Sequence, residues 1–345
     1  MSIVTENDVL KALSQVQDPE LRRDLVSLNM IKDIKITGSK VTLTVELTTP
    51  ACPLKHQIQR DVENAVLALE GVESVEVNMG ARVPEDKKIT DLAIKNIIAV
   101  ASGKGGVGKS TVAVNMAVAL VQCGAKVGLL DADIYGPNVP KMMGVHTLPP
   151  TPQDKKIQPA EAFGVKVMSI GFMVGEGQPL IWRGPLLHSA IKQFLQDVDW
   201  GELDYLIIDL PPGTGDVQLS LVQTVPLSGG VIVTTPQQVS LDDAARAVSM
   251  FNKMEVPILG IVENMSYLQM EDGSVRRLFG EGGGEQLAGL AKAPLLANIP
   301  IEESVREGGD TGVPVVVRDP NSPSAKVLIG LAMSVAARMS MVVLG

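Results

Sequence analysis

One short stretch, Gly103–Thr111, constrains the fold of this chain more than any other part of it. It reads Gly-Lys-Gly-Gly-Val-Gly-Lys-Ser-Thr and fits the phosphate-binding pattern G-x-x-x-x-G-K-S/T. An apolar run, Asn96–Ser102, precedes the loop, and residues 111–122 follow it with helical spacing up to a stop at Gly124. Strand, glycine-rich loop and helix in this order predict a parallel α/β sheet, and they make a chance glycine turn a poor alternative.

The chemistry of such a loop requires each type of residue in it. Glycines let backbone N–H groups turn toward phosphate oxygens, and the N-terminus of the following helix adds unpaired N–H donors. Lys109 is expected to reach the β- and γ-phosphates of ATP, and Ser110 is expected to hold Mg²⁺. The residues expected to bind the nucleotide here are Gly103, Lys104, Gly105, Gly106, Val107, Gly108, Lys109, Ser110 and Thr111.

Aspartates follow two further strand-like segments. Leu203–Asp216 contains an apolar strand that ends in Asp209, the place of an aspartate that orders Mg²⁺ through water. Asp131 and Asp133 come directly after the apolar run Ala125–Leu130. Ligands bind at the carboxyl ends of the strands in open α/β sheets, so these carboxylates are expected at the ligand-binding edge.

Three regions are predicted along the chain. Residues 1–80 show the order α-β-β-α-β, with a β-hairpin between Met30 and Thr48. Residues 81–94 contain Pro84 and a charged run, and they are interpreted as a linker. Residues 95–345 hold the glycine loop, so we expect an α/β P-loop NTPase domain with a mostly parallel sheet flanked by helices, preceded by the small α-β-β-α-β domain.

Composition excludes several classes of protein. The chain has 345 residues, a formal net charge of −9 and 3% aromatic residues, which disfavours a nucleic-acid partner. No run approaches about 18 uncharged apolar residues, so we expect no transmembrane helix and no membrane partner. The acidic, polar N-terminus is unlike a signal peptide. Two cysteines far apart, Cys52 and Cys123, are typical of a cytoplasmic protein with free thiols.

The second lysine of the glycine loop, Lys104, carries a resemblance to a known class. The pattern G-K-G-G-V-G-K-S resembles the deviant loop of MinD/ParA-type ATPases, in which the early lysine reaches the nucleotide of the other subunit of a homodimer. The resemblance implies catalytic roles for Lys104, Lys109 and Asp133, with Asp133 positioning the attacking water, and it implies a place for Asp131 in the magnesium shell. It also implies a nucleotide-sensing switch at Pro211–Gly215. A solvated lysine is the alternative for Lys104, and a turn or helix-capping role is the alternative for either aspartate.

Two further positions are expected beside the adenine base. Asn264 follows the predicted strand Val256–Val262, and Pro300 follows the predicted strand Leu295–Ile299. In the class that the chain resembles, the asparagine side chain bonds the edge of adenine, and Pro300 would lie by the same base pocket. The alternative for Asn264 is an Asx turn.

One cysteine is a candidate cluster ligand. The segment Leu47–Lys55, with the sequence Leu-Thr-Thr-Pro-Ala-Cys-Pro-Leu-Lys, resembles the signature of a small domain of iron–sulfur assembly factors. Cys52 precedes a predicted helix, whose dipole is expected to lower the pKa of the thiol. Cys52 is therefore a candidate transient ligand of an iron–sulfur cluster. A small buried residue at a tight turn is the alternative.

The whole chain resembles the Mrp/ApbC family of P-loop iron–sulfur cluster carriers, through motifs that include Trp182–Pro185, Phe279–Gly284 and Arg306–Pro314. It departs from that family at one place. Met270 and Gly273 stand where family members carry a Cys-x-x-Cys pair that binds a 4Fe-4S cluster between two subunits. Cluster chemistry usually needs about four thiolates, so the residues support the ATPase more strongly than they support a cluster at that place.

Three functions follow from these observations. The leading hypothesis is a cytoplasmic, homodimeric, Mg²⁺-dependent ATPase that assembles iron–sulfur clusters or transfers them to apo iron–sulfur proteins. Its expected cofactors are ATP, Mg²⁺ and a transient 4Fe-4S cluster, and its expected partners are a second copy of itself, cluster scaffold proteins and apoproteins. The alternative is a ParA/MinD-like positioning or partition ATPase, although Ala336–Gly345 lacks the basic face of a membrane-surface helix. A non-hydrolysing scaffold is the third.

Overall fold

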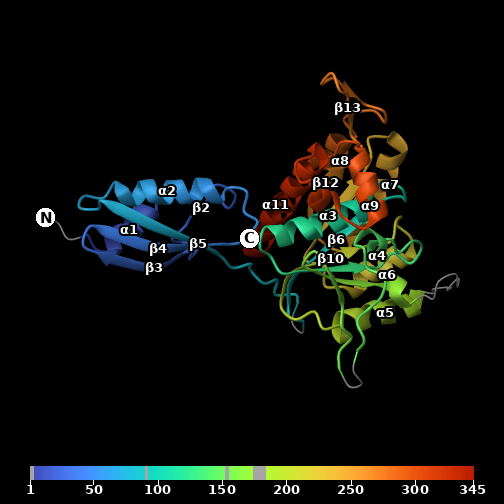
Figure 1. Ribbon diagram of the computed structural model, residues 1–345, viewed down its shortest axis with the longest axis horizontal. Helices are drawn as coiled ribbons and strands as arrows, with labels where there is room; N and C mark the ends of the chain where they lie inside the picture. The colour runs from blue at the N-terminus through green and yellow to red at the C-terminus, as the bar shows by residue number, and fades with distance from the viewer. Residues whose placement is uncertain (1–3, 90–91, 152–154, 174–183) are drawn as a thin grey trace. The chain divides into compact units, whose positions relative to one another are not determined.

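The computed structural model describes residues 4–89, 92–151, 155–173 and 184–345, without the side chains of 184–187. The chain divides into two compact units, one made of Met1–Pro84 with Ala336–Gly345 and the other of Glu85–Val335 (Figure 1). The last residues of the chain therefore belong to the first unit, where Ser340 Oγ donates a hydrogen bond to the Thr48 carbonyl over 3.3 Å.

A three-stranded sheet and two helices make up most of the first unit. The strands have the order β3-β4-β5, antiparallel between β3 and β4 and parallel between β4 and β5. Every second residue of β4 is buried, as expected for a sheet with one face on a core. The elements are α1 (Glu6–Leu13), β1 (Gln17–Asp18), β2 (Arg23–Asp24), β3 (Ile31–Thr37), β4 (Lys40–Leu47), α2 (Lys55–Leu67) and β5 (Ser74–Ala81).

The second unit is built around an eight-stranded sheet with the order β15-β12-β11-β6-β10-β7-β9-β8. All neighbouring strands are parallel except β8 and β9, which confirms the predicted mostly parallel sheet. Strands β7, β10 and β11 are buried along their whole length, which is why they form continuous apolar runs in the sequence. The strands are β6 (Ile94–Ser102), β7 (Val127–Asp131), β8 (Ala160–Ala162), β9 (Val165–Ser169), β10 (Leu203–Asp209), β11 (Gly229–Thr234), β12 (Ile258–Glu263) and β15 (Leu295–Asn298).

Helices flank this sheet and connect its strands (Figure 1). Helix α3 follows β6 through the glycine loop, as predicted, and most of its residues are buried. A short hairpin of β13 (Leu268–Gln269) and β14 (Val275–Arg276) comes after β12. The helices are α3 (Lys109–Gln122), α4 (Val139–Met142), α5 (Gly184–Asp197), α6 (Asp216–Thr224), α7 (Gln238–Lys253), α8 (Gly283–Ala291), α9 (Glu303–Thr311), α10 (Val315–Arg318) and α11 (Pro323–Leu344), with a 3-10 turn at Ile170–Met173.

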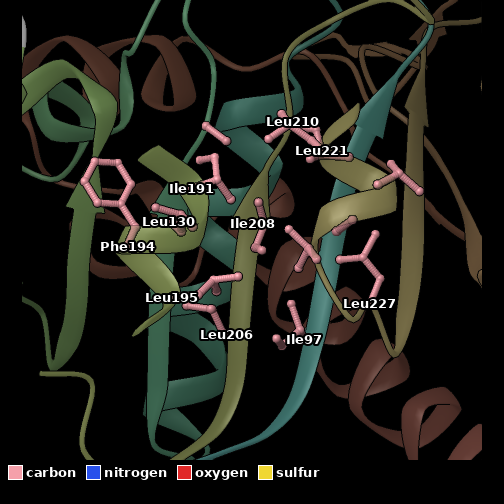
Figure 2. Packing of buried hydrophobic residues seen from close by; sticks show 14 of the residues in the cluster. Ile97, Leu130, Ile191, Phe194, Leu195, Leu206, Ile208, Leu210, Leu221 and Leu227 are labelled. Carbon is pink, nitrogen blue, oxygen red and sulfur yellow. The ribbon is translucent and has the colours of Figure 1, made fainter. Parts of the chain in front are cut away.

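One hydrophobic cluster fixes α5 and α6 against the central strands (Figure 2). Helix α5 contributes Ile191 and Phe194, α6 contributes Leu221, and the sheet contributes Leu206 and Ile208 from β10. Burying apolar surface contributes about 25 cal/mol per Å² to stability. Because the cluster holds α6 against β10, it also anchors the loop between them, which is the predicted switch segment.

Helix α11 is 22 residues long and is apolar enough, by length and composition, to pass as a membrane span. Within the structure, 44% of its most apolar window is buried. Leu328, Leu331 and Val335 are at most 1% exposed and recur at the spacing of one helix face. That burial is typical of a packed helix, and no other helix in the described parts of the chain passes the same test.

Candidate functional site

The glycine loop runs into the N-terminus of α3. Gly108 is the N-cap residue of this helix with a φ of 85°, and Gly106 has a φ of 82°, a left-handed conformation that glycine adopts without steric cost. A Cβ on Gly103 would lie 2.1 Å from the carbonyl carbon of Asp243 in α7, so a side chain cannot fit there. The loop is thereby shaped to turn its backbone N–H groups toward an anion at the helix N-terminus.

Lys109 is buried beneath the loop and contacts two of the predicted aspartates. Its Nζ lies 2.6 Å from Asp209 Oδ1 and 3.6 Å from Asp133 Oδ2, and its side chain is 5% exposed. The hydroxyl of Ser110 lies 3.4 Å from the same Nζ. Asp209 ends β10 directly beside Asp131 at the end of β7. The structure thus brings these five residues together at the carboxyl edge of the sheet, beside the glycine loop.

One carboxylate oxygen of Asp209 has no hydrogen-bond partner among the described residues. Oδ2 is buried and accepts no hydrogen bond from the residues that the structure describes, whereas Oδ1 accepts one from Lys109. Burial raises the pKa of Asp209, and the Lys109 ammonium and the Ser110 hydroxyl oppose that shift. A buried polar atom without a partner costs about 1–3 kcal/mol unless water or an ion satisfies it. The oxygen therefore fits the water shell of a nucleotide-bound Mg²⁺, an ion that prefers oxygen ligands and retains several waters.

Asp131 holds the loop that follows it through hydrogen bonds to the loop backbone. Its Oδ1 accepts the Asp133 N–H over 3.1 Å, and its Oδ2 accepts the Ser169 hydroxyl over 2.9 Å and the Val139 N–H over 3.3 Å. Burial and the charge of Asp209 raise the pKa of Asp131 to about 8, against the effect of the bonds from Asp133 and Ser169. Asp131 thus positions Asp133 through the backbone, and its place in a magnesium shell stays a prediction.

Two adjoining cavities surround the glycine loop. The first has a volume of about 300 Å³ and is lined by Lys104, Gly105, Gly106, Lys109, Ser110, Asp133 and Pro212, among others. The second has a volume of about 470 Å³ and is lined by Asn264, Pro300, Ile301, Glu302, Val305 and Arg306, among others. Both are also lined by Gly108, Thr111, Asn138, Met142 and Met265. A space beside the glycine loop, with Lys109, Ser110 and Asp133 in its wall, continues into a larger one, and together they fit the phosphates and the base of one nucleotide.

Asn264 connects the larger cavity to the glycine loop. Its Nδ2 donates a hydrogen bond to the carbonyl of Val107 over 2.8 Å, and the same side chain lines the larger cavity with Pro300. The next residue, Met265, has a φ of 55°, a left-handed conformation that is uncommon for a residue other than glycine. The asparagine therefore fixes the loop that precedes α3, and its bond to adenine stays a prediction.

Sequence reasoning missed the two helices that complete the larger cavity, α4 and α9. Lys141 of α4 and Arg306 of α9 both line it. The helices meet where Gly144 and Gly312 touch, since a Cβ on Gly312 would lie 2.6 Å from the Gly144 Cα. Gly312 has a φ of 74° and ends α9. The glycines were visible in the sequence, but nothing local indicated that they pack against each other.

Cys52 does not have the environment that the sequence predicted. It is 8% exposed, and α2 begins only at Lys55. Burial raises the pKa of the Cys52 thiol to about 11, and the charges of Glu20 and Asp18 add to the rise, while the Leu54 backbone opposes it. The predicted lowering of this pKa is wrong, because burial outweighs the helix terminus.

Met270 and Gly273 lie in the turn of the hairpin between β13 and β14. The Gly273 N–H donates to the Met270 carbonyl over 3.0 Å, and the φ of Gly273 is 82°. A tight turn therefore stands where the resemblance places cysteines. Across the described ranges, no three His, Cys, Asp or Glu side chains form a group that could hold a metal ion. The Trp182–Pro185 motif begins with Trp182 and Arg183, and both lie outside the described residues.

Comparisons with known proteins bear on both units. Residues 93–336 match the family model described as NUBPL iron-transfer P-loop NTPase, and residues 6–79 match the model of an iron–sulfur cluster assembly protein. The chain is 54% identical over 352 residues to an iron–sulfur cluster carrier protein of Synechocystis sp., covering 99% of this chain and 100% of that protein. It is 52% identical over 334 residues to one of Deinococcus radiodurans, covering 96% and 95%.

Solved structures resemble about two thirds of the chain. A nucleotide-binding protein of Archaeoglobus fulgidus in complex with ADP has 39% identity and a TM-score of 0.59, covering 68% of this chain and 91% of that one. The cell division ATPase MinD of Pyrococcus furiosus has 26% identity and a TM-score of 0.53, covering 69% and 97%. The chain therefore belongs to the NUBPL-type family of iron-transfer P-loop NTPases, whose members include the iron–sulfur cluster carrier proteins.

Proposed function

We propose that this chain is a Mg²⁺-dependent ATPase that works as a homodimer and couples its nucleotide state to the carriage of iron–sulfur clusters to apoproteins. The observation that carries the ATPase is the buried contact of Lys109 with Asp209, 2.6 Å long beneath the glycine loop. Lys109 neutralises Asp209, and it also lines a cavity of a size that fits phosphate groups. It can therefore exchange the aspartate for a phosphate as its partner.

Each residue has a distinct part in this proposal. With nucleotide bound, Lys109 would leave Asp209 for the β- and γ-phosphates. Asp209 would then hold the waters around Mg²⁺, and the Ser110 hydroxyl would hold the ion itself. Asp133, held by the Asp131 carboxylate through its backbone, orients the attacking water. Mg²⁺ held by these residues would supply positive charge against the phosphoryl oxygens.

Lys104 is assigned to the second subunit's nucleotide. It lines the phosphate cavity, and its carbonyl accepts the Ser102 hydroxyl over 2.9 Å, which fixes the backbone of the loop while leaving the side chain out of that bond. Two large apolar side chains of this unit, Tyr135 and Val239, are 72% and 66% exposed. Exposed aromatic and aliphatic side chains of this kind favour burial against a second copy.

The cluster is cargo in this proposal, and its ligands come in part from elsewhere. The chain has two cysteines, Cys52 and Cys123, and burial raises the pKa of both thiols. A 4Fe-4S cluster is usually held by about four thiolates. Partner proteins or small thiols would therefore complete the ligand set, and opening of the first unit around Cys52 would precede binding through that residue.

A positioning ATPase is the second candidate, and one observation favours it. Helix α11 is long and apolar enough, by length and composition only, to cross a membrane, and 44% of its most apolar window is buried. Sedimentation with liposomes that depends on ATP would support that function. The burial of the α11 face and the iron–sulfur names of the full-length relatives favour the carrier.

The proposal is tested by phosphate release and by the mass of the protein in solution. Wild-type protein with Mg²⁺ and ATP should release phosphate and sediment as a dimer, and Lys104→Ala should remain folded yet lose both properties. Lys326→Ala, an exposed lysine of α11, is the matched control and should keep both. Unchanged dimerisation and hydrolysis in Lys104→Ala would remove the role across the interface, and no hydrolysis in the wild type would remove the ATPase.

A further inference from the structure

A third cavity lies in the second unit, apart from the glycine loop. It has a volume of about 370 Å³, which is within the usual range of ligand sites. Its walls come from the segment before β6, from α5 and from the end of α6. None of its lining residues lines either cavity of the nucleotide site. It therefore requires its own explanation.

The cavity has a cationic rim over an apolar floor. Lys88, His188 and Lys192 line it together with the buried side chains Ile89 and Leu195. Positions 188 and 192 are one helical turn apart on α5, beside the face from which Ile191, Phe194 and Leu195 pack on the sheet (Figure 2). The same packing that anchors α5 thus holds two basic side chains at the cavity.

The electrostatics of the cavity differ from those of the whole chain, whose formal net charge is −9. Its described lining includes two lysines and no carboxylate. Neither Lys88 nor Lys192 forms an ion pair with a carboxylate in the described part of the chain. The acid closest in sequence, Asp86, accepts the backbone N–H of Lys88 over 3.0 Å. Two ammonium groups beside an apolar floor remain available to an anion.

A hydrogen-bond chain fixes the histidine. His188 Nδ1 lies 2.6 Å from Thr224 Oγ1, and that hydroxyl lies 2.6 Å from the Ser220 carbonyl. A hydroxyl has one hydrogen, and the carbonyl can only accept it, so Nδ1 carries a hydrogen and donates to Thr224. The second ring nitrogen, Nε2, is not used in that chain. The imidazole is thereby oriented by α6 and contributes a polar edge to the cavity.

We infer that this cavity binds an organic anion, with its carboxylate between Lys88 and Lys192 and its apolar body on Ile89 and Leu195. The apolar part of such an anion would cover Ile89 and Leu195, which a bare inorganic ion would leave exposed to water. The carboxylate explains two lysines that form no ion pair with an acidic side chain among the described residues. Such a group is supplied by a small metabolite or by the C-terminus of a peptide, and the two share this chemistry.

Helix α6 connects the cavity to the nucleotide site, and this step rests on the proposed function. The helix begins at Asp216, directly after Pro211–Gly215, and it ends at Thr224 in the cavity wall. In its first turn Gln218 is 1% exposed, and neither amide atom has a hydrogen-bond partner among the described residues. An unpaired buried amide is unfavourable, so a position of α6 in which Gln218 finds hydrogen-bond partners would be favoured over this one. Movement of the switch with the γ-phosphate would therefore change the cavity.

The binding test uses the full chain saturated with Mg²⁺ and ADP, which fills the nucleotide site. Fluorescence titration with 8-anilinonaphthalene-1-sulfonate, an anion with an apolar body, should reveal one site that ADP does not block. Lys192→Glu should weaken that site at least about tenfold, because an attractive charge becomes a repulsive one. Lys326→Glu makes the same charge change on α11 and should leave it unchanged. Equal ADP affinity in all three proteins shows that each is folded.

Competition then identifies the ligand chemistry. 4-Phenylbutyrate should displace the probe, and its uncharged amide should not. A short peptide ending in a leucine carboxylate, compared with its amidated form, separates a peptide source from a metabolite source, and either source supports the anion site. Absence of an ADP-resistant site, equal weakening in both lysine variants, or equal competition by acid and amide would overturn the inference.

The coupling has its own readout. Probe affinity should differ at least about threefold between protein saturated with ADP and protein saturated with a non-hydrolysable ATP analogue. Equal affinities would contradict the coupling through α6. Phosphate release measured on the same sample shows separately whether the proposed ATPase has failed.

Discussion

Lys109 and Asp209, a hundred residues apart in sequence, form the shortest lysine–carboxylate contact of the nucleotide site, with Nζ and Oδ1 2.6 Å apart. Their side chains are 5% and 1% exposed. The other oxygen of Asp209 has no partner among the described residues. Each side chain therefore compensates the charge of the other in the protein without nucleotide. The proposed function requires Lys109 to exchange Asp209 for phosphate oxygens.

The first prediction concerns stability without nucleotide. Lys109→Met should lower the free energy of unfolding of the second unit by about 3 kcal/mol at pH 8, because it leaves a buried carboxylate without its counter-charge. Burial raises the pKa of Asp209, so the protonated carboxyl is the form favoured by folding. The loss should therefore shrink as pH falls toward about 4, the pKa of an unfolded aspartate.

The matched control is the double variant Lys109→Met/Asp209→Asn. It removes both charges and should recover most of the stability at pH 8. Urea denaturation followed by tryptophan fluorescence reports on this unit, because Trp182 and Trp200 are the only tryptophans of the chain. A double variant no more stable than the single one would argue against the ion pair as the source of the effect.

Substitution by alanine should destabilise the protein at one glycine of the loop and leave it nearly unchanged at another. A Cβ on Gly103 would lie 2.1 Å from the backbone of α7, whereas the nearest atom to a Cβ on Gly105 is 3.9 Å away, on Pro212. Gly103→Ala should therefore lower the free energy of unfolding by about 1–3 kcal/mol and weaken ADP binding. Gly105→Ala should leave the free energy of unfolding nearly unchanged. Thermal unfolding and ADP titration of both variants measure this difference. Similar losses in the two would show that the approach to α7 is not the constraint.

Asn264 should act on nucleotide affinity through the loop. Asn264→Ala removes the hydrogen bond to the Val107 carbonyl, which is worth about 1 kcal/mol, so ADP should bind about fivefold more weakly. Calorimetric titration measures the change, with Asn298→Ala at the exposed end of β15 as control. An unchanged affinity in Asn264→Ala would separate this bond from nucleotide binding.

The pH dependence of thiol alkylation tests the environment of Cys52. The pKa of the Cys52 thiol, raised by burial to about 11, lies well above the usual range of cysteine, so the reactive thiolate is scarce at pH 8. In a Cys123→Ala background, iodoacetamide should label Cys52 roughly 100-fold more slowly at pH 8 than it labels an unfolded control in urea. The rate should keep rising up to about pH 11. A plateau near pH 8 would contradict the burial argument.

The phosphate side of the site could be predicted from local sequence. Gly103–Thr111 and Asp209 each follow an apolar strand, and parallel strands place their carboxyl ends at one edge. These signals are local because backbone geometry alone positions the residues. The strands and helices of the core could be predicted for the same reason, because each is a run of apolar residues bounded by glycine or proline.

What could not be predicted depends on tertiary contacts. The predicted lowering of the Cys52 pKa was wrong because the environment of the thiol is set by residues distant in sequence, among them Glu20. The cavity walls from α4 and α9 were missed because the contact of Gly144 with Gly312 joins segments with no shared pattern. Asp131 accepts a hydrogen bond from the hydroxyl of Ser169 on a neighbouring strand, and no motif around Asp131 indicated this contact.

The rate of cluster transfer tests the central claim most directly. Protein reconstituted anaerobically with iron and sulfide is mixed with an apo iron–sulfur protein, and transfer is followed by visible absorption and by activity of the acceptor. Mg²⁺ with ATP should change the transfer rate of the wild type relative to ADP, and Lys109→Met, loaded in the same way, should show no such response. Equal rates with ATP, with ADP and without nucleotide in the wild type, or no cluster on the wild type at all, would contradict it.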